Sequence, residues 1–105
     1  WERLHVDLWT PAHAVSPEAI PQLYAIYRLT DGDFRRGLFW AGNFGRDADT
    51  LTAIIGALAG ARYGVGIMPP EWVAVVRRPA GVSLKFAAQE DLLALADDLV
   101  NLIYA

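Results

Sequence analysis

The strongest constraint on the fold is an apolar run rich in small residues, from Leu51 to Ala61. It is eleven residues long, whereas a membrane-spanning helix needs about 20 apolar residues. Glycines 56, 60 and 64 repeat every four positions and so fall close to one face of a helix. Because a glycine inside a helix costs about 1 kcal/mol relative to alanine, this stripe predicts close approach of another helix. We therefore expect a buried helix over residues 47–63, apolar on nearly all sides.

Capping residues and helix breakers divide the rest of the chain into further helices. Ser16 is a candidate N-cap with Pro17 as first helical residue, although Pro21 could move the start later. Asp31–Gly32 ends this helix, and Asp33 can cap the next one. Segment 4–8 reads either as a short strand or as a helix end. The pattern predicts an all-α helical bundle, with helices over about 16–30, 34–42, 47–63, 70–76 and 88–104.

Length and hydrophobicity bound the domain organisation. The 105 residues are enough for one small domain. However, 54% of them are hydrophobic, which is high because small domains bury a smaller share of their surface. The first residue is Trp1 rather than a methionine. An oligomer, or a piece cut from a larger protein, would explain the high hydrophobicity, and the absent initiator methionine fits the second explanation.

Charge and cysteine content exclude several classes of function. The net charge is −3 and the arginines are scattered, so we expect no nucleic-acid partner, which would need a basic stripe. No signal peptide is visible and no run is long enough to span a membrane, so we expect no membrane partner. The absence of cysteine excludes disulfides and thiolate metal ligands, and fits a reducing, cytoplasmic location.

Two carboxylates and a hydroxyl directly precede the apolar run, in the sequence Asp47–Ala48–Asp49–Thr50. One interpretation is a helix cap, because Asp47 suits the N-cap and a first-turn carboxylate is stabilised by the helix dipole. The other is part of a metal site: adjacent carboxylates repel unless a positive charge lies between them. Oxygen ligands suit Mg²⁺, Mn²⁺ or Ca²⁺. Arg46 offers an alternative counter-charge, so spacing alone leaves both interpretations open.

The remaining chemically active side chains have simpler explanations. The two histidines, His5 and His13, lack partners at metal-ligand spacing, so we expect structural or surface roles. Four large aromatic residues are expected in the core: Tyr24, Tyr27, Phe39 and Trp40.

The segment "NFGRDADTLTAIIGALAGARYG", followed by "MPPEWV", resembles the C-terminal signature of the ADP-ribosylglycohydrolase family, which includes dinitrogenase-reductase-activating glycohydrolases. Members typically show Asn-x-Gly-Gly-Asp-Thr-Asp-Thr, an apolar helix ending in Gly-Ala-x-x-Gly, and Ile-Pro-x-x-Trp. The counterparts here are Asn43, Gly45, Arg46, Asp47, Ala48, Asp49 and Thr50, then 60–64, Met68–Pro69 and Trp72. The resemblance covers Glu18 to Trp72 and, more loosely, the last helix.

The resemblance implies an all-helical fold and a centre of two Mg²⁺ or Mn²⁺ ions. Asp47, Asp49 and Thr50 would be metal ligands. Asn43, Gly45 and Arg46 become candidates for binding substrate, as does Ser16, since residues 13–16 occupy the place where the family approaches the adenosine half. The implied reaction is hydrolysis of the bond between ADP-ribose and a protein side chain or a small conjugate.

This sequence departs from the family pattern at two positions and in its extent. Arg46 stands where glycine is commonest, and Ala48 replaces the middle threonine, but neither change removes a ligand. The family's other ligands and its acidic catalytic residue come from upstream Gly-Asp and Thr-Asp-Asp segments. We therefore expect residues 1–105 to be the C-terminal third of one domain, to require the upstream remainder of the same polypeptide, and to be inactive and poorly folded alone. The alternative is a catalytically inactive relative that serves as a helical binding or structural module.

Overall fold

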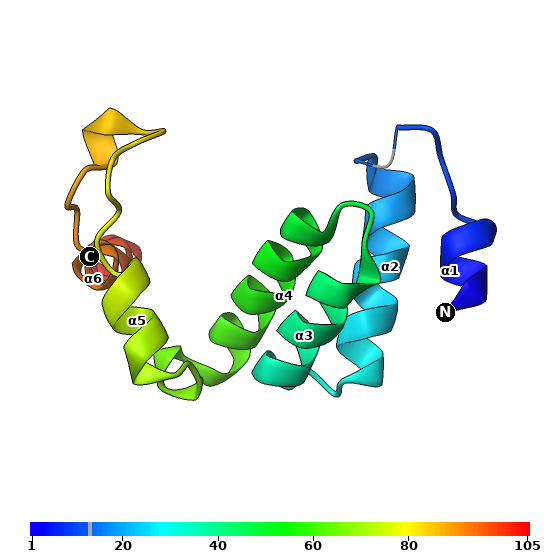
Figure 1. Ribbon diagram of the computed structural model, residues 1–105. Helices are drawn as coiled ribbons and strands as arrows, with labels where there is room; N and C mark the ends of the chain where they lie inside the picture. Colours follow the sequence, from blue (N-terminus) through cyan, green and yellow to red (C-terminus); the bar gives the residue numbers. More distant parts are fainter. Residues whose placement is uncertain (13) are drawn as a thin grey trace. The chain divides into compact units, whose positions relative to one another are not determined.

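The computed structural model describes residues 1–12 and 14–105. Within these residues the regular structure is entirely helical (Figure 1), which confirms the predicted all-α class. The chain divides into two compact units, residues 1–67 and 68–105, which are described separately. The first contains helices α1 (Glu2–Val6), α2 (Ser16–Leu29), α3 (Phe34–Phe44) and α4 (Ala48–Tyr63), with a 3-10 turn at Val65–Ile67. The second contains α5 (Pro70–Val76), a 3-10 turn at Lys85–Ala87 and α6 (Leu92–Tyr104).

The core of the first unit lies where α2, α3 and α4 meet. Its buried side chains come from all three helices, with Leu4 of α1 and two further residues packed against them at the edge. Helices α3 and α4 run antiparallel and side by side (Figure 1), joined by a short loop. The buried core cluster consists of Ala19, Leu23, Ile26, Ala41, Phe44, Leu51 and Ile55.

Helices α3 and α4 approach each other closely at Gly37 of α3, and less closely at Gly56 of α4. A Cβ atom on Gly37 would lie 2.7 Å from Cγ2 of Ile55, inside van der Waals contact. At Gly56 the nearest atoms, from Leu38 and Phe34, would be 3.8 and 4.0 Å away, which is ordinary packing distance. The predicted close approach is therefore not found at Gly56, whereas Gly37, which the stripe did not include, lies against Ile55 with no room for a methyl group.

Helix α4 buries one stripe rather than its whole surface. Leu51, Ile55 and Ala59 are buried, at the spacing of four expected for one face, whereas Leu58 is 41% exposed. The predicted burial on nearly all sides is wrong for this chain, because α2 and α3 cover only one side of α4. Three of the four aromatic residues expected in the core are also exposed, because they lie on faces of α2 and α3 that no other helix of the described residues covers: Tyr24 (69%), Phe39 (76%) and Trp40 (40%).

Several helix ends differ from the sequence-based expectation, each for a local reason. Val15, not Ser16, is the N-cap of α2, and Pro21 is accommodated inside that helix. Helix α3 continues through Phe44, two residues beyond the expected end, because the positive φ angle that ends it comes at Gly45. Helix α6 begins at Leu92, four residues later than expected, because the carboxylate of Asp91 accepts hydrogen bonds from the first free N–H groups.

The second unit is held by polar contacts around Asp91. Its carboxylate forms ion pairs with Arg77 (2.6 Å) and Arg78 (2.9 Å), and it accepts the backbone N–H of Leu93. The hydrogen bond from Arg77 lowers the pKa of Asp91 to about 2. None of the residues of α5 or α6 is buried.

Candidate functional site

The loop between α3 and α4 places the predicted metal ligands at the start of α4. Gly45 and Arg46 have φ angles of +83° and +59°, so the chain turns sharply between the two antiparallel helices. A non-glycine residue in this left-handed region is strained unless the surrounding structure compensates. The strain falls on Arg46, immediately before Asp47.

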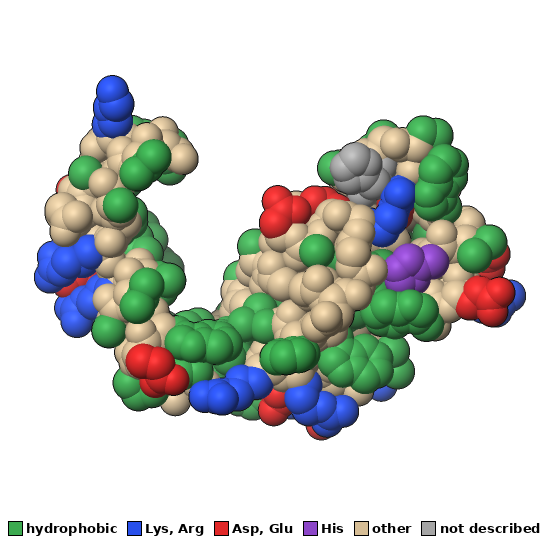
Figure 2. Space-filling view, viewed as in Figure 1, with side chains coloured by type: hydrophobic (Ala, Val, Ile, Leu, Met, Phe, Trp, Pro, Cys, Tyr) green, Lys and Arg blue, Asp and Glu red, His purple; other side chains and the backbone are tan. Residues whose placement is uncertain are grey.

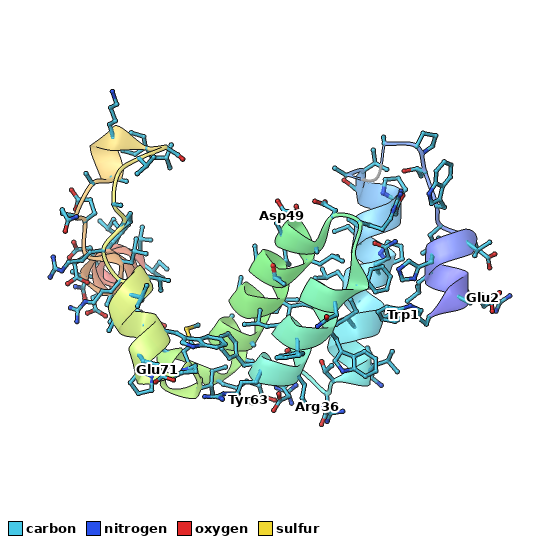
Figure 3. The ribbon with its side chains drawn as sticks, in the orientation of Figure 1. Trp1, Glu2, Arg36, Asp49, Tyr63 and Glu71 are labelled. Carbon is cyan, nitrogen blue, oxygen red and sulfur yellow. The ribbon has the colours of Figure 1, made fainter. Side chains whose placement is uncertain are left out.

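Asp47 is the N-cap residue of α4, yet its carboxylate makes no capping hydrogen bond. Its backbone carbonyl oxygen accepts the N–H of Leu51 at 3.0 Å, which starts the helix. The capping interpretation is thus correct for the position of Asp47 and wrong for its side chain. Asp47 is half-buried, Asp49 is exposed, and Figure 3 shows Asp49 where α4 begins. Acidic surface appears at this end of α4 in Figure 2.

The side-chain oxygens of Asp47, Asp49 and Thr50 have no hydrogen-bond or ion-pair partner among the described residues. Thr52, one turn from Ala48, is different: its hydroxyl donates to the Ala48 and Asp49 carbonyl oxygens at 2.8 and 2.9 Å. Two carboxylates and a hydroxyl are the kind of oxygen ligands that a hard cation takes. Among the described residues no cluster of three or more acidic or histidine side chains could hold a metal, so a complete site would need ligands from elsewhere.

Arg46 is anchored to the start of α2 by an ion pair whose carboxylate, from Glu18, is fully buried. Its Nε donates to Oε1 of Glu18 at 2.6 Å, and its Nη2 donates to Oε2 at 3.0 Å. The same Nη2 donates to the carbonyl oxygen of Thr10 at 2.5 Å, and the guanidinium lies 5.4 Å from the Trp9 ring centre. Glu18 is fully buried and also accepts both the N–H and the hydroxyl of Thr10.

The charge state of Glu18 follows from these contacts. The hydrogen bond from Arg46 lowers the pKa of Glu18 from 4.5 to about 2, with further lowering by Thr10, against the opposing effect of burial. Glu18 raises the pKa of Arg46 in turn. Both groups therefore remain charged across the physiological range, and the pair is bidentate.

The predicted substrate-binding residues fall on the same end of the unit. Asn43 is in the last turn of α3, where its Nδ2 donates to the Phe39 carbonyl oxygen at 2.7 Å, and it borders a hollow of about 300 Å³ with three aromatic residues. Gly45 is exposed, and open space lies around its Cβ position. Ser16 is the exposed first residue of α2, two positions before Glu18. Of the predicted loop 13–16, His13 lies outside the described residues.

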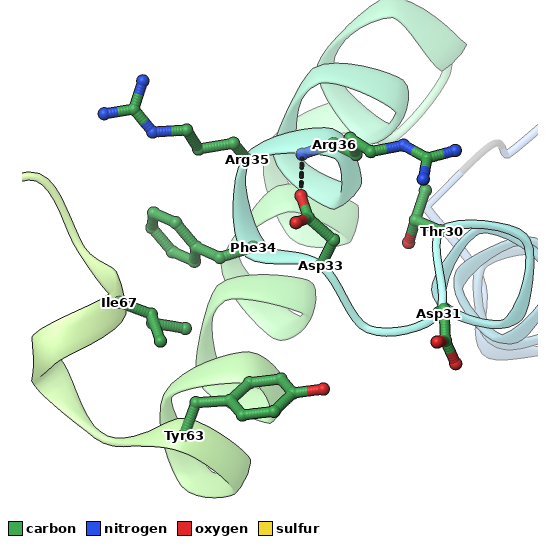
Figure 4. Close-up of a pocket in the computed structure, with 8 residues that line it drawn as sticks. All are labelled: Thr30, Asp31, Asp33, Phe34, Arg35, Arg36, Tyr63 and Ile67. Atoms are coloured by element: carbon green, nitrogen blue, oxygen red, sulfur yellow. Dashed lines mark hydrogen bonds between the residues drawn. The ribbon is translucent and has the colours of Figure 1, made fainter.

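A larger hollow lies at the opposite end of α3 and α4. It has a volume of about 480 Å³ and is bordered by Asp31, Asp33 and Tyr63, among others (Figure 4). Asp33 accepts the N–H of Arg36 at 2.7 Å, which confirms its predicted role as the cap of α3. This hollow contains none of the predicted site residues.

Sequence reasoning missed Glu18 as the partner of Arg46. A signal was present, because Glu18, Gln22 and Ile26 lie four residues apart on one helix face. All three are buried. A carboxylate on an otherwise buried face requires a partner, and Arg46 was the candidate cation nearest the predicted ligands. His5 has the structural role expected, since its Nε2 lies 2.9 Å from the carbonyl oxygen of Phe44 and its ring stacks on the Phe44 ring.

Comparison with known proteins identifies the family of this chain. The family model described as ADP-ribosylglycohydrolase matches residues 2–105. The chain belongs to the ADP-ribosylglycohydrolase family. A similar protein is the ADP-ribosylarginine hydrolase Tri1 of Pseudomonas putida (strain GB-1), which is 35% identical over 82 residues. The match covers 78% of this chain and 22% of that relative, so the chain spans less than a quarter of its length. No solved structure matches.

The family pattern bears on one feature of the loop, the backbone angle of Arg46. Glycine is the commonest family residue at the position of Arg46, and the φ angle of +59° there is one that glycine adopts without strain. The family match extends beyond the signature segment to α5 and α6. In the part of the chain that the structure describes, no helix combines the length and apolar character that a membrane span requires.

Proposed function

We propose that the protein containing this chain hydrolyses the glycosidic bond between ADP-ribose and an arginine side chain or a related acceptor. The observation that supports this most is the trio Asp47, Asp49 and Thr50. In a chain of the ADP-ribosylglycohydrolase family, their side-chain oxygens lie at one helix start without partners among the described residues. The name of the Pseudomonas relative makes arginine the first acceptor to test.

In the proposed reaction, water adds to the anomeric carbon of the ribose while the bond to the acceptor nitrogen breaks. The acceptor leaves as the neutral group after gaining a proton, and the transition state resembles an oxocarbenium ion. Two Mg²⁺ or Mn²⁺ ions, when bound, would orient the ribose hydroxyls and lower the pKa of a water molecule. The acidic catalytic residue and the remaining ligands are expected from the part of the polypeptide upstream of Trp1.

The residues of this chain would contribute binding and orientation. Asp47 and Asp49 would supply negatively charged oxygen ligands, and Thr50 a neutral one through its hydroxyl. Asn43, Gly45 and Ser16 lie at the same end of the unit and are proposed to contact the substrate. Arg46 was also predicted to contact substrate, but its Nε and Nη2 groups are engaged by Glu18 and Thr10.

Two threonines in the same helix turn provide a matched test in the full-length protein. Thr50→Val removes a hydroxyl that we propose as a ligand, whereas Thr52→Val removes one that is bonded to its own helix. We expect Thr50→Val to lower Mn²⁺-dependent release of ADP-ribose from ADP-ribosylarginine at least 10-fold, since even groups behind the ligands are worth about 10–100-fold. Thr52→Val should stay within about 2-fold of wild type, because valine keeps the shape of threonine. Equal losses in both variants would refute a specific role for Thr50.

The same assay decides between the proposed function and the alternative, a catalytically inactive binding module. If the full-length protein released no ADP-ribose with Mg²⁺ or Mn²⁺ and bound neither ion in calorimetry, the inactive binding module would be the better description.

A further inference from the structure

The position of Asp47 and Asp49 depends on a loop that contains a strained residue. Arg46 has a φ angle of +59° and directly precedes Asp47, and neighbouring Gly45 also has a positive φ. Local backbone preference does not favour this conformation for an arginine. A contact outside the loop must therefore hold it in place.

The side chain of Arg46 supplies that contact. Its guanidinium makes a two-point bond with Glu18, 28 residues earlier in the chain, and a further bond with the carbonyl oxygen of Thr10. The Glu18 carboxylate is itself fixed, because it is fully buried and accepts two hydrogen bonds from Thr10. The loop is thus tied both to the first turn of α2 and to the segment that precedes it.

We propose that Glu18 and Arg46 are positioning residues for the metal-binding loop: the Glu18–Arg46 pair fixes the backbone of Arg46 and thereby aims the Asp47 and Asp49 carboxylates. This inference rests on the proposed function for its metal-binding consequence. It gives Arg46 a role different from the substrate contact that its place in the sequence predicted. An ion pair here replaces the conformational freedom that glycine supplies at this position in other family members.

The variant Arg46→Gly tests whether the loop is held by the Arg46 side chain or only needs a residue that tolerates this backbone conformation. Glycine adopts a φ angle of +59° without strain, so if Arg46 only occupied the position, the change would leave the loop as ordered as before. If the side chain holds the loop, the variant loses the anchoring contact and leaves the buried Glu18 carboxylate without its ion-pair partner. Arg46→Lys should be intermediate, because lysine keeps the charge but cannot form the two-point bond.

A double variant separates positioning from stability. Glu18→Gln combined with Arg46→Gly removes the unpaired buried charge of Glu18. The double variant should therefore regain part of the thermal stability that Arg46→Gly loses. The anchor stays absent, so the loop should remain mobile. If the ion pair contributed only to stability, the double variant, which is more stable than Arg46→Gly, should also have the better-ordered loop.

The test uses two measurements on the full-length protein, at a temperature where every variant is folded. The first, without metal, is hydrogen exchange at the amide of Leu51, which is buried and bonded to the Asp47 carbonyl oxygen. We expect at least 10-fold faster exchange in Arg46→Gly and in the double variant. The second is Mn²⁺ affinity by calorimetry, which we expect to fall about 10–100-fold in both.

Arg62→Ala is the matched control. Arg62 lies in the same helix, about 20 Å from Ala48 along its axis, and its pKa is also raised, first by Tyr27. Both readouts should match wild type in this variant. Unchanged exchange at Leu51 in Arg46→Gly, or recovery of exchange and affinity in the double variant, would overturn the positioning role. A wild-type protein that bound no Mn²⁺ would overturn the proposed function and the metal consequence, whereas the exchange result would still decide whether the pair orders the loop.

Discussion

The contact between Gly37 and Ile55 makes a quantitative prediction about the packing that supports the site. In an open position, Gly→Ala inside a helix gains about 1 kcal/mol of stability. At Gly37 the new methyl group would lie 2.7 Å from Cγ2 of Ile55, which is only 1% exposed, whereas carbon atoms prefer about 3.5–4.0 Å. Overpacking of this kind costs about 1–3 kcal/mol. Gly37→Ala should therefore destabilise the protein by about 1 kcal/mol net.

The effect of Gly37→Ala on the free energy of unfolding should reverse sign once Ile55 is shortened. Ile55→Ala removes the clashing Cγ2 atom and by itself costs about 2–5 kcal/mol. In that background Gly37→Ala should stabilise by about 1 kcal/mol, because the propensity gain remains and the clash is gone. The coupling between the two substitutions should thus be about 1–3 kcal/mol, typical of residues in contact.

Urea unfolding of the full-length protein measures this cycle. Gly42→Ala is the matched control in the same helix, because the nearest atom to its new methyl group would be Cγ2 of Thr52, 3.9 Å away. That variant should be neutral to about 1 kcal/mol more stable. If Gly37→Ala stabilised the protein equally with Ile55 and with Ala at position 55, α3 and α4 would not approach as closely as described, and the reasoning would fail.

Two further predictions concern pH and the isolated chain. Because the pKa of Glu18 is lowered from 4.5 to about 2, its contribution to stability is complete above pH 4.5 and is lost as the pH falls toward 2. Glu18→Gln should accordingly flatten the fall in melting temperature between pH 5 and 3, and an unchanged slope would contradict the pKa shift. The isolated 105 residues should not unfold in a single cooperative transition by circular dichroism, because α5 and α6 contain no buried residue that would couple them to a core; one cooperative melt of the full native helix content would contradict this.

The parts of the fold that local chemistry decides could be predicted from the sequence. Asp33 caps α3 because its carboxylate reaches an N–H three residues on. Helix α5 begins at Pro70 because proline suits a first helical position. The end of α3 was missed because Gly42 reads as a helix stop, and only the backbone angle of Gly45 shows where the chain turns.

The long-range features of the site could not be predicted in the same way. Placing Asp47, Asp49 and Thr50 at the start of a helix needed only the sequence around them. The spacing of Glu18, Gln22 and Ile26 indicates that Glu18 is buried and needs a partner. Its pairing with Arg46, 28 residues away, depends on the packing of α2 against the α3–α4 loop. The same limit hid the contact of Gly37 with Ile55, which depends on how α3 and α4 cross.

A Mn²⁺ titration of ADP-ribose release tests the central claim most directly. The full-length protein and its Asp49→Asn variant would be compared at one fixed concentration of ADP-ribosylarginine, from chelated to saturating Mn²⁺. Asparagine keeps the shape of the side chain and removes its charge. The account predicts no release without metal, and a half-saturating Mn²⁺ concentration at least 10-fold higher in the variant. Superimposable curves, or release that persists in the presence of chelator, would contradict it.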